Sequence, residues 1–198
     1  MHITLLRHAP TPGNLQKRYV GRIDEPLSEE GVAYAQSFEP NTSVARVFTS
    51  GLERTKQTAG LLFPQAQIIP LAGLNEMDFG DFEGRTAAEM EFDSTYRAWV
   101  EGGCKSTCPG GEDMSSFTER CVAAFLEVIS SAARDNSESE TFVIHGGTIM
   151  AIMSTLALPI KPQIHWMTTN CGGFVVVYDQ TEHERRPLQL HESIRRSR

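Results

Sequence analysis

Two histidines carry the strongest chemical signal in the sequence. His8 stands after the apolar residues 3–6 and Arg7. His145 directly follows a second apolar run, residues 141–144. Short runs of this kind predict buried strands, and open α/β sheets bind their ligands at the carboxyl ends of the strands. We therefore expect both imidazole groups to face one crevice.

Two arginines indicate what the histidines would hold. Arg7 ends the first apolar run, and Arg54 falls in the first turn of a helix for which residues 50–53 predict a capping box. A single arginine there is usually a solvated surface residue, but two guanidinium groups bind phosphate oxygens bidentately. Gly146 and Gly147 would let backbone N–H groups at a helix N-terminus approach an anion. These residue types predict a phosphoryl ligand.

The elements that must position these side chains follow an α/β pattern. Apolar, β-prone runs predict strands at residues 3–6, 45–49, 141–144 and 173–178. Their nearly continuous apolar character predicts a sheet covered on both faces. Helical spacing and end signals predict helices at residues 28–38, 50–63 and 112–134, and from 146 to before Pro159. The predicted fold is a three-layer α/β/α architecture with a mostly parallel central sheet and a small helical cap.

Size and charge exclude several classes of protein. The chain has 198 residues and no repeat or linker, so we interpret residues 1–198 as one domain, with a cap at about 83–111 and a tail at about 185–198. Its 18 Lys and Arg against 25 Asp and Glu give a net charge of −7, which disfavours nucleic-acid binding. The longest apolar run is too short for a membrane span, and the N-terminus lacks a signal-peptide pattern. We expect a cytoplasmic protein that acts on a small phosphorylated metabolite, and we leave a homodimer open.

The remaining cysteines and histidines predict no further chemistry. Four cysteines are too few for a disulfide scaffold, and Cys104 and Cys108 lack a second Cys/His pair that would complete a zinc site. We predict no metal site and no cofactor. His165 and Trp166 could fringe the pocket. Four histidines lack partners at recognisable spacing and are interpreted as structural or surface residues: His2, His165, His183 and His191.

Several motifs in a fixed order resemble one known family. They occupy residues 6–11 with Asn14, then 24–31, 50–58, 74–84, 109–112 and 143–147. This pattern is similar to that of the histidine phosphatase superfamily, which includes cofactor-dependent phosphoglycerate mutases and many phosphomonoesterases. The resemblance covers residues 3 to about 178. The family usually has Gly and then Glu or Gln after its first histidine, where this chain has Ala9 and Pro10, so substrate preference is the property placed in doubt.

The resemblance implies roles for individual residues. His8 would be the nucleophile that forms a phosphohistidine, His145 a second catalytic residue, and Glu76 the proton donor to the leaving alcohol. The phosphoryl group would be bound by Arg7, Asn14, Arg54, His145 and Gly146. A histidine with a reference pKa of about 6.5 can attack as neutral imidazole near neutrality. An alkoxide leaves poorly without a proton, and Glu83 competes with Glu76 for that role, with motif position favouring Glu76.

Three functions remain open at this stage. The first is a metal-independent phosphomonoesterase, which the short segment between Glu76 and His145 favours. The second is a phosphoglycerate mutase, which would have to shield its phosphohistidine from water. The third is a non-catalytic module that binds a phospholigand, although such a module would be expected to have lost His8, Arg54 or Glu76.

The substrate is suggested by one stretch of the chain. Residues 18–28 look most like the α-ribazole phosphatase branch of the family, whose substrate joins a phosphomonoester to a flat aromatic base. Tyr19, Phe79 or Phe82 could stack on that base. The alternative is a phosphatase of broad specificity in which these aromatic side chains only pack the cap.

Overall fold

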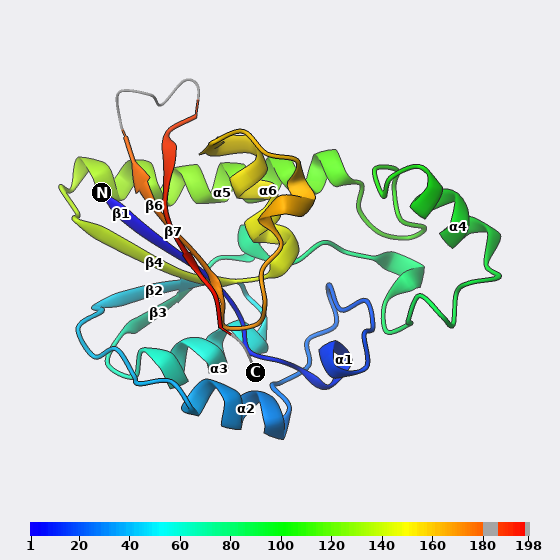
Figure 1. Cartoon of the computed structure of the whole chain (residues 1–198), viewed down its shortest axis with the longest axis horizontal. Coiled ribbons are helices and arrows are strands. Elements are labelled where there is room, and N and C mark those ends of the chain that lie inside the picture. Colours follow the sequence, from blue (N-terminus) through cyan, green and yellow to red (C-terminus); the bar gives the residue numbers. More distant parts are fainter. Residues whose placement is uncertain (180–185, 197–198) are drawn as a thin grey trace.

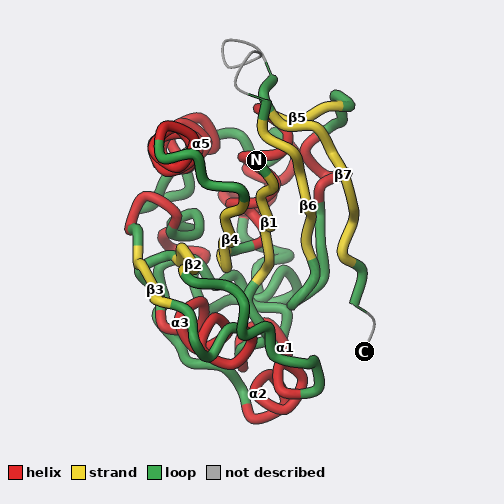
Figure 2. The backbone as a smooth tube through the Cα atoms, turned by 90° about the vertical axis from the view of Figure 1, so that its left-hand side faces the viewer, coloured by secondary structure: helices red, strands yellow, loops and turns green. Residues whose placement is uncertain are grey.

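A single mixed sheet organises the computed structural model, which describes residues 1–179 and 186–196. Within those residues the sheet has seven strands in the order β3-β2-β4-β1-β6-β7-β5. Their bounds are β1 (His2–Arg7), β2 (Arg46–Thr49), β3 (Gln67–Pro70), β4 (Ser139–Ile144), β5 (Ala157–Leu158), β6 (Gly173–Tyr178) and β7 (Leu188–Ile194). Figure 2 shows β3 at one side of this sheet and β7 at the other.

Strand direction brings the candidate residues to one edge. Strands β3, β2, β4 and β1 pair in parallel, whereas β6 runs antiparallel to both β1 and β7. The prediction of a mostly parallel sheet is therefore confirmed. The carboxyl ends of β1, β2 and β4 lie side by side, which is where ligands of such sheets bind.

Helices cover both faces of the sheet (Figure 1). Helices α5 (Met114–Arg134) and α6 (Gly146–Leu156) lie on one face, and α2 (Glu29–Gln36) and α3 (Glu53–Leu62) on the other. Leu5 packs toward α5 and α6, whereas its neighbour Leu6 packs toward Leu62 of α3. Successive strand residues are thus buried on opposite faces, which explains why the strands read as continuous apolar runs.

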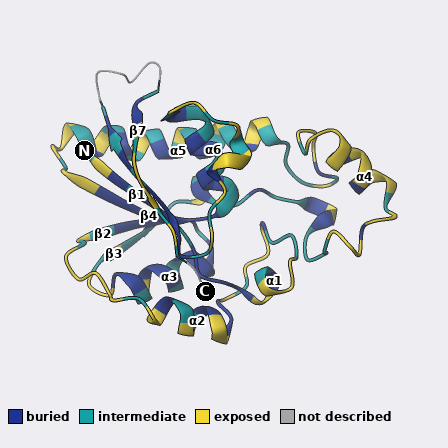
Figure 3. Cartoon of the chain, in the orientation of Figure 1, coloured by how far each residue is buried: buried dark blue, intermediate teal, exposed yellow. Residues whose placement is uncertain are grey.

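The predicted cap region contains one regular helix. Helix α4 (Ser94–Glu101) lies away from the sheet at the far end of the molecule in Figure 1. Its exposed outer side is visible in Figure 3, while Tyr96 and Trp99 pack onto Phe82. The remaining short elements are α1 (Pro12–Leu15) and the 3₁₀ turns Ala72–Leu74, Gly80–Phe82 and Gln163–Trp166.

The tail predicted at about 185–198 is wrong for most of its length. Residues Leu188–Ile194 form β7, which pairs with β5 and β6 inside the sheet. Polar residues on this strand concealed it, because only Leu188 is fully buried. Arg196, also within the predicted tail, packs on the protein, since its guanidinium carbon lies 3.9 Å from the centre of the Phe38 ring. The last two residues, like His183, lie outside the described residues.

No helix within residues 1–179 and 186–196 combines the length and apolar character that a membrane span needs.

Candidate active site

The sheet places His8 and His145 next to each other. Strands β1 and β4 are parallel neighbours with Arg7 opposite Ile144, so the residues that follow these two are also neighbours. The His8 backbone N–H donates to the Ile144 carbonyl at 2.9 Å. The two imidazole rings lie 5.2 Å apart, centre to centre, at an angle of 67°. The structure thus brings together the two imidazole rings that the sequence analysis singled out.

The hydrogen bonding of His8 fixes which ring nitrogen is free. Its Nδ1 lies 2.6 Å from the carbonyl oxygen of Ala9. A carbonyl oxygen only accepts, so Nδ1 carries the proton and Nε2 of the neutral ring keeps its lone pair. Burial, and then the charges of Arg54 and Arg7, hold the pKa of His8 well below its usual value. His8 is therefore neutral near pH 7, with a nucleophilic nitrogen at Nε2.

His145 is held in the opposite tautomer from His8, by different partners. The Nε–H of Arg54 donates to its Nδ1 at 3.3 Å, so its Nε2 must carry the proton and donate to the hydroxyl of Ser50 at 2.8 Å. The Ser50 hydroxyl is in turn hydrogen-bonded to the Thr55 hydroxyl, which donates to the carbonyl of Leu52. Burial, with Arg54 next in size, lowers the pKa of His145 well below its usual value.

Arg54 is completely buried and held by backbone carbonyls. Its Nη1 donates to Ile23 and its Nη2 to Gly21, both at 2.8 Å. Burial lowers its pKa, and nearby carboxylates, Glu76 first, partly restore it. The predicted capping box at residues 50–53 does not form, because the helix begins after Leu52 without a side-chain cap. The Ser50 hydroxyl instead accepts hydrogen bonds from the Leu52 N–H and from Nε2–H of His145.

Arg7 carries a buried donor that no described residue satisfies. Its Nη1 donates to the carbonyl of Thr168 at 3.0 Å, but its Nε is buried without a hydrogen-bond acceptor. The guanidinium group lies against the first turn of α6, where a Cβ added to Gly146 would stand 3.4 Å from Nε. Glycine at this position lets the arginine and the helix N-terminus share one small space.

Glu76 reaches the same helix N-terminus. Its Oε2 accepts the N–H of Gly147 at 2.9 Å, and its Oε1 accepts the N–H of Met77 at 3.0 Å. A Cβ on Gly147 would lie 2.3 Å from Oε1, so a glycine is needed for this approach. Removal of the carboxyl group from water raises the pKa of Glu76. The two N–H groups and the charges of Arg54 and Arg7 act in the opposite direction but are outweighed. The carboxyl group therefore holds a proton more readily than an exposed one.

Glu83, considered above as an alternative proton donor, binds backbone N–H groups instead. Its two oxygens accept the backbone N–H groups of Gly21, Arg22 and Phe79, at 2.9 to 3.1 Å. This carboxylate fixes the loop whose carbonyls hold Arg54. In the structure Glu83 holds the loop in place through these hydrogen bonds.

Asn14 takes part in local structure beside the site. Its Oδ1 accepts the backbone N–H of Thr11 at 3.3 Å, which completes a capping box for α1. The amide of Asn170, a residue that the sequence analysis did not single out, lies 3.5 Å from that oxygen and donates to the His8 carbonyl at 2.8 Å. Asn170 and Ser50 escaped detection because their contacts join residues far apart in the chain.

The aromatic side chains proposed to stack on a substrate mainly pack on one another. Phe82 is only 1% exposed, so it cannot stack on a ligand. Tyr19 contacts the Phe79 ring at 5.1 Å between centres, and its hydroxyl lies 3.0 Å from that of Tyr96. Trp166 is fully buried against Phe174, so the expectation that it fringes the pocket is wrong.

The other candidate residues stay outside the histidine site. His2, His165 and His191 are exposed. Cys104 and Cys108 are free thiols, and the described residues contain no group of three or more His, Cys, Asp or Glu placed to hold a metal ion.

The fold and the site together define an α/β protein with two neutral histidines and two arginines, of which Arg54 is fully buried, at the carboxyl edge of its sheet. A family model for the histidine phosphatase superfamily (branch 1) matches residues 3–189, and the chain belongs to that superfamily. Members of the superfamily are phosphatases or mutases.

Relatives of both kinds are similar to this chain. The adenosylcobalamin/α-ribazole phosphatase of Salmonella typhimurium is 29% identical, over 89% of this chain and 94% of its own length. A 2,3-bisphosphoglycerate-dependent phosphoglycerate mutase of Gloeobacter violaceus is 29% identical, over 78% and 74%. The crystal structure of the α-ribazole phosphatase from Shigella flexneri has a TM-score of 0.82 at 25% identity, covering 98% of this chain and 96% of that one. The phosphoglycerate mutase of Bacillus anthracis shares the fold, with a TM-score of 0.79 at 20% identity over 98% and 92%.

The two neutral histidines predict how stability depends on pH. The unfolded chain protonates them below a pKa of about 6.5, whereas the folded protein does not, so unfolding becomes easier as the pH falls below that value. Each histidine contributes a slope of about 1.4 kcal/mol per pH unit. Replacing His8→Asn should therefore remove about half of this combined slope, measured by urea unfolding between about pH 5 and pH 7.5.

The exposed His165, replaced by Asn, provides the matched control for this measurement. The pKa of Glu76 shifts in the opposite sense, but that residue is present in every protein compared. An unchanged slope in His8→Asn would contradict the neutral state assigned to His8.

Proposed function

We propose that this chain is a metal-independent phosphomonoesterase that hydrolyses a small phosphorylated metabolite through a phosphohistidine on His8. The observation that carries the proposal is the neutral His8 ring, with its lone pair at Nε2, lying beside two buried guanidinium groups. Phosphoryl transfer requires an in-line nucleophile and positive groups around the phosphate oxygens. Both are supplied by this chain's own side chains.

In the first step, Nε2 of His8 attacks phosphorus and the bond to the leaving oxygen breaks. The proton of Glu76 moves to that oxygen, so an alcohol leaves and Glu76 becomes a carboxylate. Arg54 holds the phosphoryl oxygens, and the unpaired Nε–H of Arg7 gains an acceptor. His145 would join them by turning its Nε2–H from the Ser50 hydroxyl to the phosphoryl group. The N-terminus of α6 at Gly146 and the side chain of Asn14 add further donors.

In the second step, water attacks the phosphohistidine. Glu76 takes the proton that the water loses, the bond from nitrogen to phosphorus breaks, and inorganic phosphate forms. This step restores neutral His8 and protonated Glu76. A mutase would instead have to exclude water until a second alcohol entered.

Hydrolysis is favoured over the mutase reaction by the small size of the cap. Between Glu76 and His145 only one short helix, α4, stands outside the α/β core (Figure 1). A non-catalytic phospholigand module is disfavoured because His8, Arg54 and Glu76 are all present and each is fixed by its own hydrogen bonds.

For the substrate we propose α-ribazole 5′-phosphate, which would place the reaction in assembly of the lower nucleotide loop of cobalamin, in the cytoplasm. The similarity to relatives named α-ribazole phosphatase supports this choice. The packing of the aromatic side chains weakens the stacking argument, since only Tyr19 and Phe79 keep partial exposure. A phosphatase of broad specificity is the second candidate.

The proposed nucleophile can be tested by its removal. His8→Ala should abolish hydrolysis of p-nitrophenyl phosphate while the protein stays folded, because no other side chain takes the phosphoryl group. His165→Ala is the control and should retain full activity. Chelator treatment of the wild type should change nothing, since the arginines supply the positive charge. Normal turnover by His8→Ala, or loss with chelator and rescue by Mg²⁺ or Zn²⁺, would contradict the proposal.

The proton donor can be tested with two leaving groups. Glu76→Gln should slow hydrolysis of alkyl phosphates about 10²–10⁴-fold, because an alkoxide needs the proton. It should slow p-nitrophenyl phosphate much less, because that phenolate leaves unaided. Steady-state kcat/KM on both substrates measures the difference. Equal losses would transfer the role to another group, with Glu83 the next to examine.

The substrate can be tested by competition between metabolites. We expect kcat/KM for α-ribazole 5′-phosphate to exceed those for 3-phosphoglycerate and phosphoserine by at least about tenfold, equivalent to about 1.4 kcal/mol in transition-state binding. A smaller preference would favour the phosphatase of broad specificity.

A further inference from the structure

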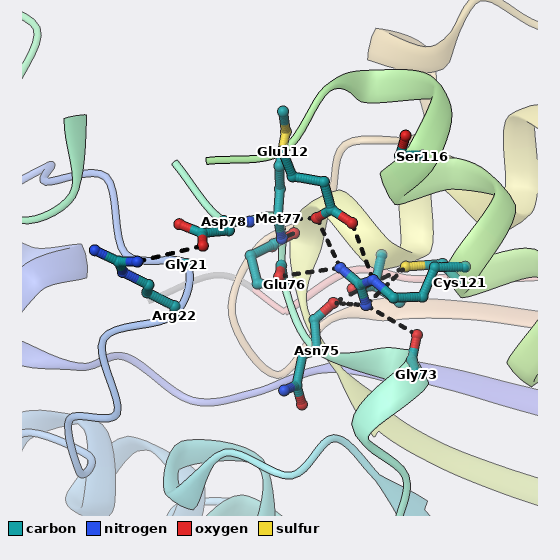
Figure 4. A network of polar contacts seen from close by, with 12 residues as sticks. Gly21, Arg22, Gly73, Asn75, Glu76, Met77, Asp78, Glu112, Ser116 and Cys121 are labelled. Carbon is teal, nitrogen blue, oxygen red and sulfur yellow. Dashed lines mark hydrogen bonds and ion pairs between the residues drawn. The ribbon is translucent and has the colours of Figure 1, made fainter. Parts of the chain in front are cut away.

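A second arginine system, centred on Arg120 of α5, surrounds the chain segment that carries Glu76. Its Nε and Nη2 donate to the two carboxylate oxygens of Glu112, at 3.0 and 2.9 Å. Its Nη1 donates to the carbonyls of Gly73 and Asn75, both at 3.0 Å, and Nη2 lies 3.5 Å from the Glu76 carbonyl. Figure 4 shows these contacts as dashed lines, with Gly73, Asn75, Glu76 and Glu112 labelled. The guanidinium group thus holds three carbonyls immediately before and at Glu76.

The Glu112 end of the pair holds the other side of the same segment. The Glu112 backbone N–H donates to the Asp78 carbonyl at 2.9 Å, and the Asp78 N–H lies 3.4 Å from the Glu112 carboxylate. Next to it, the Asp81 N–H donates to the Pro109 carbonyl at 2.8 Å. Gly80 permits this close pairing because its φ is +53° and a Cβ would lie 2.0 Å from the Pro109 oxygen. The motif at residues 109–112, to which the sequence analysis assigned no role, therefore holds residues 78–81 in place through backbone hydrogen bonds.

Glu76 sits between these two attachments. Residues 73–75 are bound to Arg120 on one side and residue 78 to Glu112 on the other, and the two side chains bind each other. The segment lies between a 3₁₀ turn and a loop, so its carbonyls depend on these donors rather than on a strand or helix ladder. A charged donor makes stronger hydrogen bonds than a neutral one and fixes the carbonyls more firmly.

A comparable pair elsewhere in the chain shows what a purely structural ion pair would look like. Arg46 of β2 also binds both carboxylate oxygens of a glutamate, Glu140 of β4. Glu140 is fully buried, as a structural glutamate in the sheet would be. That pair contacts neither Glu76 nor the histidines in any described hydrogen bond. Arg120, by contrast, directs Nη1 and Nη2 at three carbonyls of the Glu76 segment, and Nη1 also lies 3.9 Å from the Cys121 sulfur.

We infer that Arg120 and Glu112 are positioning residues that set the Glu76 carboxyl group against the N-terminus of α6 and so govern proton transfer to the leaving group. The inference rests on the proposed function of Glu76 as proton donor. Neither residue touches the phosphoryl site. Their loss should therefore affect reactions that need the proton and spare those that do not. A displacement of about 1 Å in such a group is enough to cost on the order of 100-fold in rate.

The kinetic test uses Arg120→Lys and Glu112→Gln, with Arg46→Lys as the matched control. The first two variants should lose about 10- to 100-fold in kcat on an alkyl phosphate, yet less than about threefold on p-nitrophenyl phosphate. Inhibition by inorganic phosphate should stay at the wild-type level. The ratio of the two activities does not depend on how much of a variant is folded. Arg46→Lys should leave that ratio unchanged even where it lowers the melting temperature.

A second measurement keeps the inference separate from the proposed function. The Gly147 amide donates to the Glu76 carboxylate, so its NMR chemical shift reports where that carboxylate lies. Arg120→Lys and Glu112→Gln should move this resonance, and Arg46→Lys should not. If Glu76→Gln itself shows no dependence on leaving group, the proposed acid is wrong, while the Gly147 shift still tests the positioning. An unmoved Gly147 resonance, or equal losses on both substrates, would overturn the inference.

Discussion

Two buried guanidinium groups, those of Arg7 and Arg54, determine the electrostatics at the carboxyl edge of the sheet. Buried charge is costly unless it is compensated, and here the compensation comes from backbone carbonyls and from nearby carboxyl groups, with Glu76 first for both arginines. The same positive charge adds to burial in keeping His8 and His145 neutral. A protein with a net charge of −7 thus presents a local region suited to a phosphate.

The parts that hold these charges in place come from segments far apart in the chain. Glu83 fixes the loop whose carbonyls bind Arg54, and Arg120 with Glu112 fixes the segment of Glu76. Glu83, which accepts backbone N–H groups, and Glu112, which pairs with Arg120, thus support the site from outside it. This arrangement leaves His8, Arg7 and the N-terminus of α6 free to meet the ligand.

The sequence predicted those features that depend on neighbouring residues. The apolar runs gave the positions of β1 and β4, and through them the meeting of His8 with His145. Helix α5 was expected at 112–134 and begins at Met114, after an aspartate cap. Strand β3, by contrast, is a short edge strand, and β7 is largely polar, so neither carries a continuous apolar signal.

Features that depend on distant partners could not be predicted in this way. Ser50 has the type and position of a helix cap, but its hydroxyl serves His145, 95 residues away. Glu83 resembles a surface carboxylate until the loop at residues 21–23 folds over it. The predicted roles of Phe82 and Trp166 failed for the same reason, since their burial is decided by the packing of other segments.

The most direct test of the account is to identify the atom that carries phosphate in the trapped intermediate. Rapid quenching during turnover, followed by ³¹P NMR and peptide mass spectrometry, can locate it. The account predicts an acid-labile, alkali-stable phosphoryl group on Nε2 of His8, because Nδ1 is committed to the Ala9 carbonyl. Phosphate on Nδ1, on another residue, or on no residue during demonstrated turnover would contradict it.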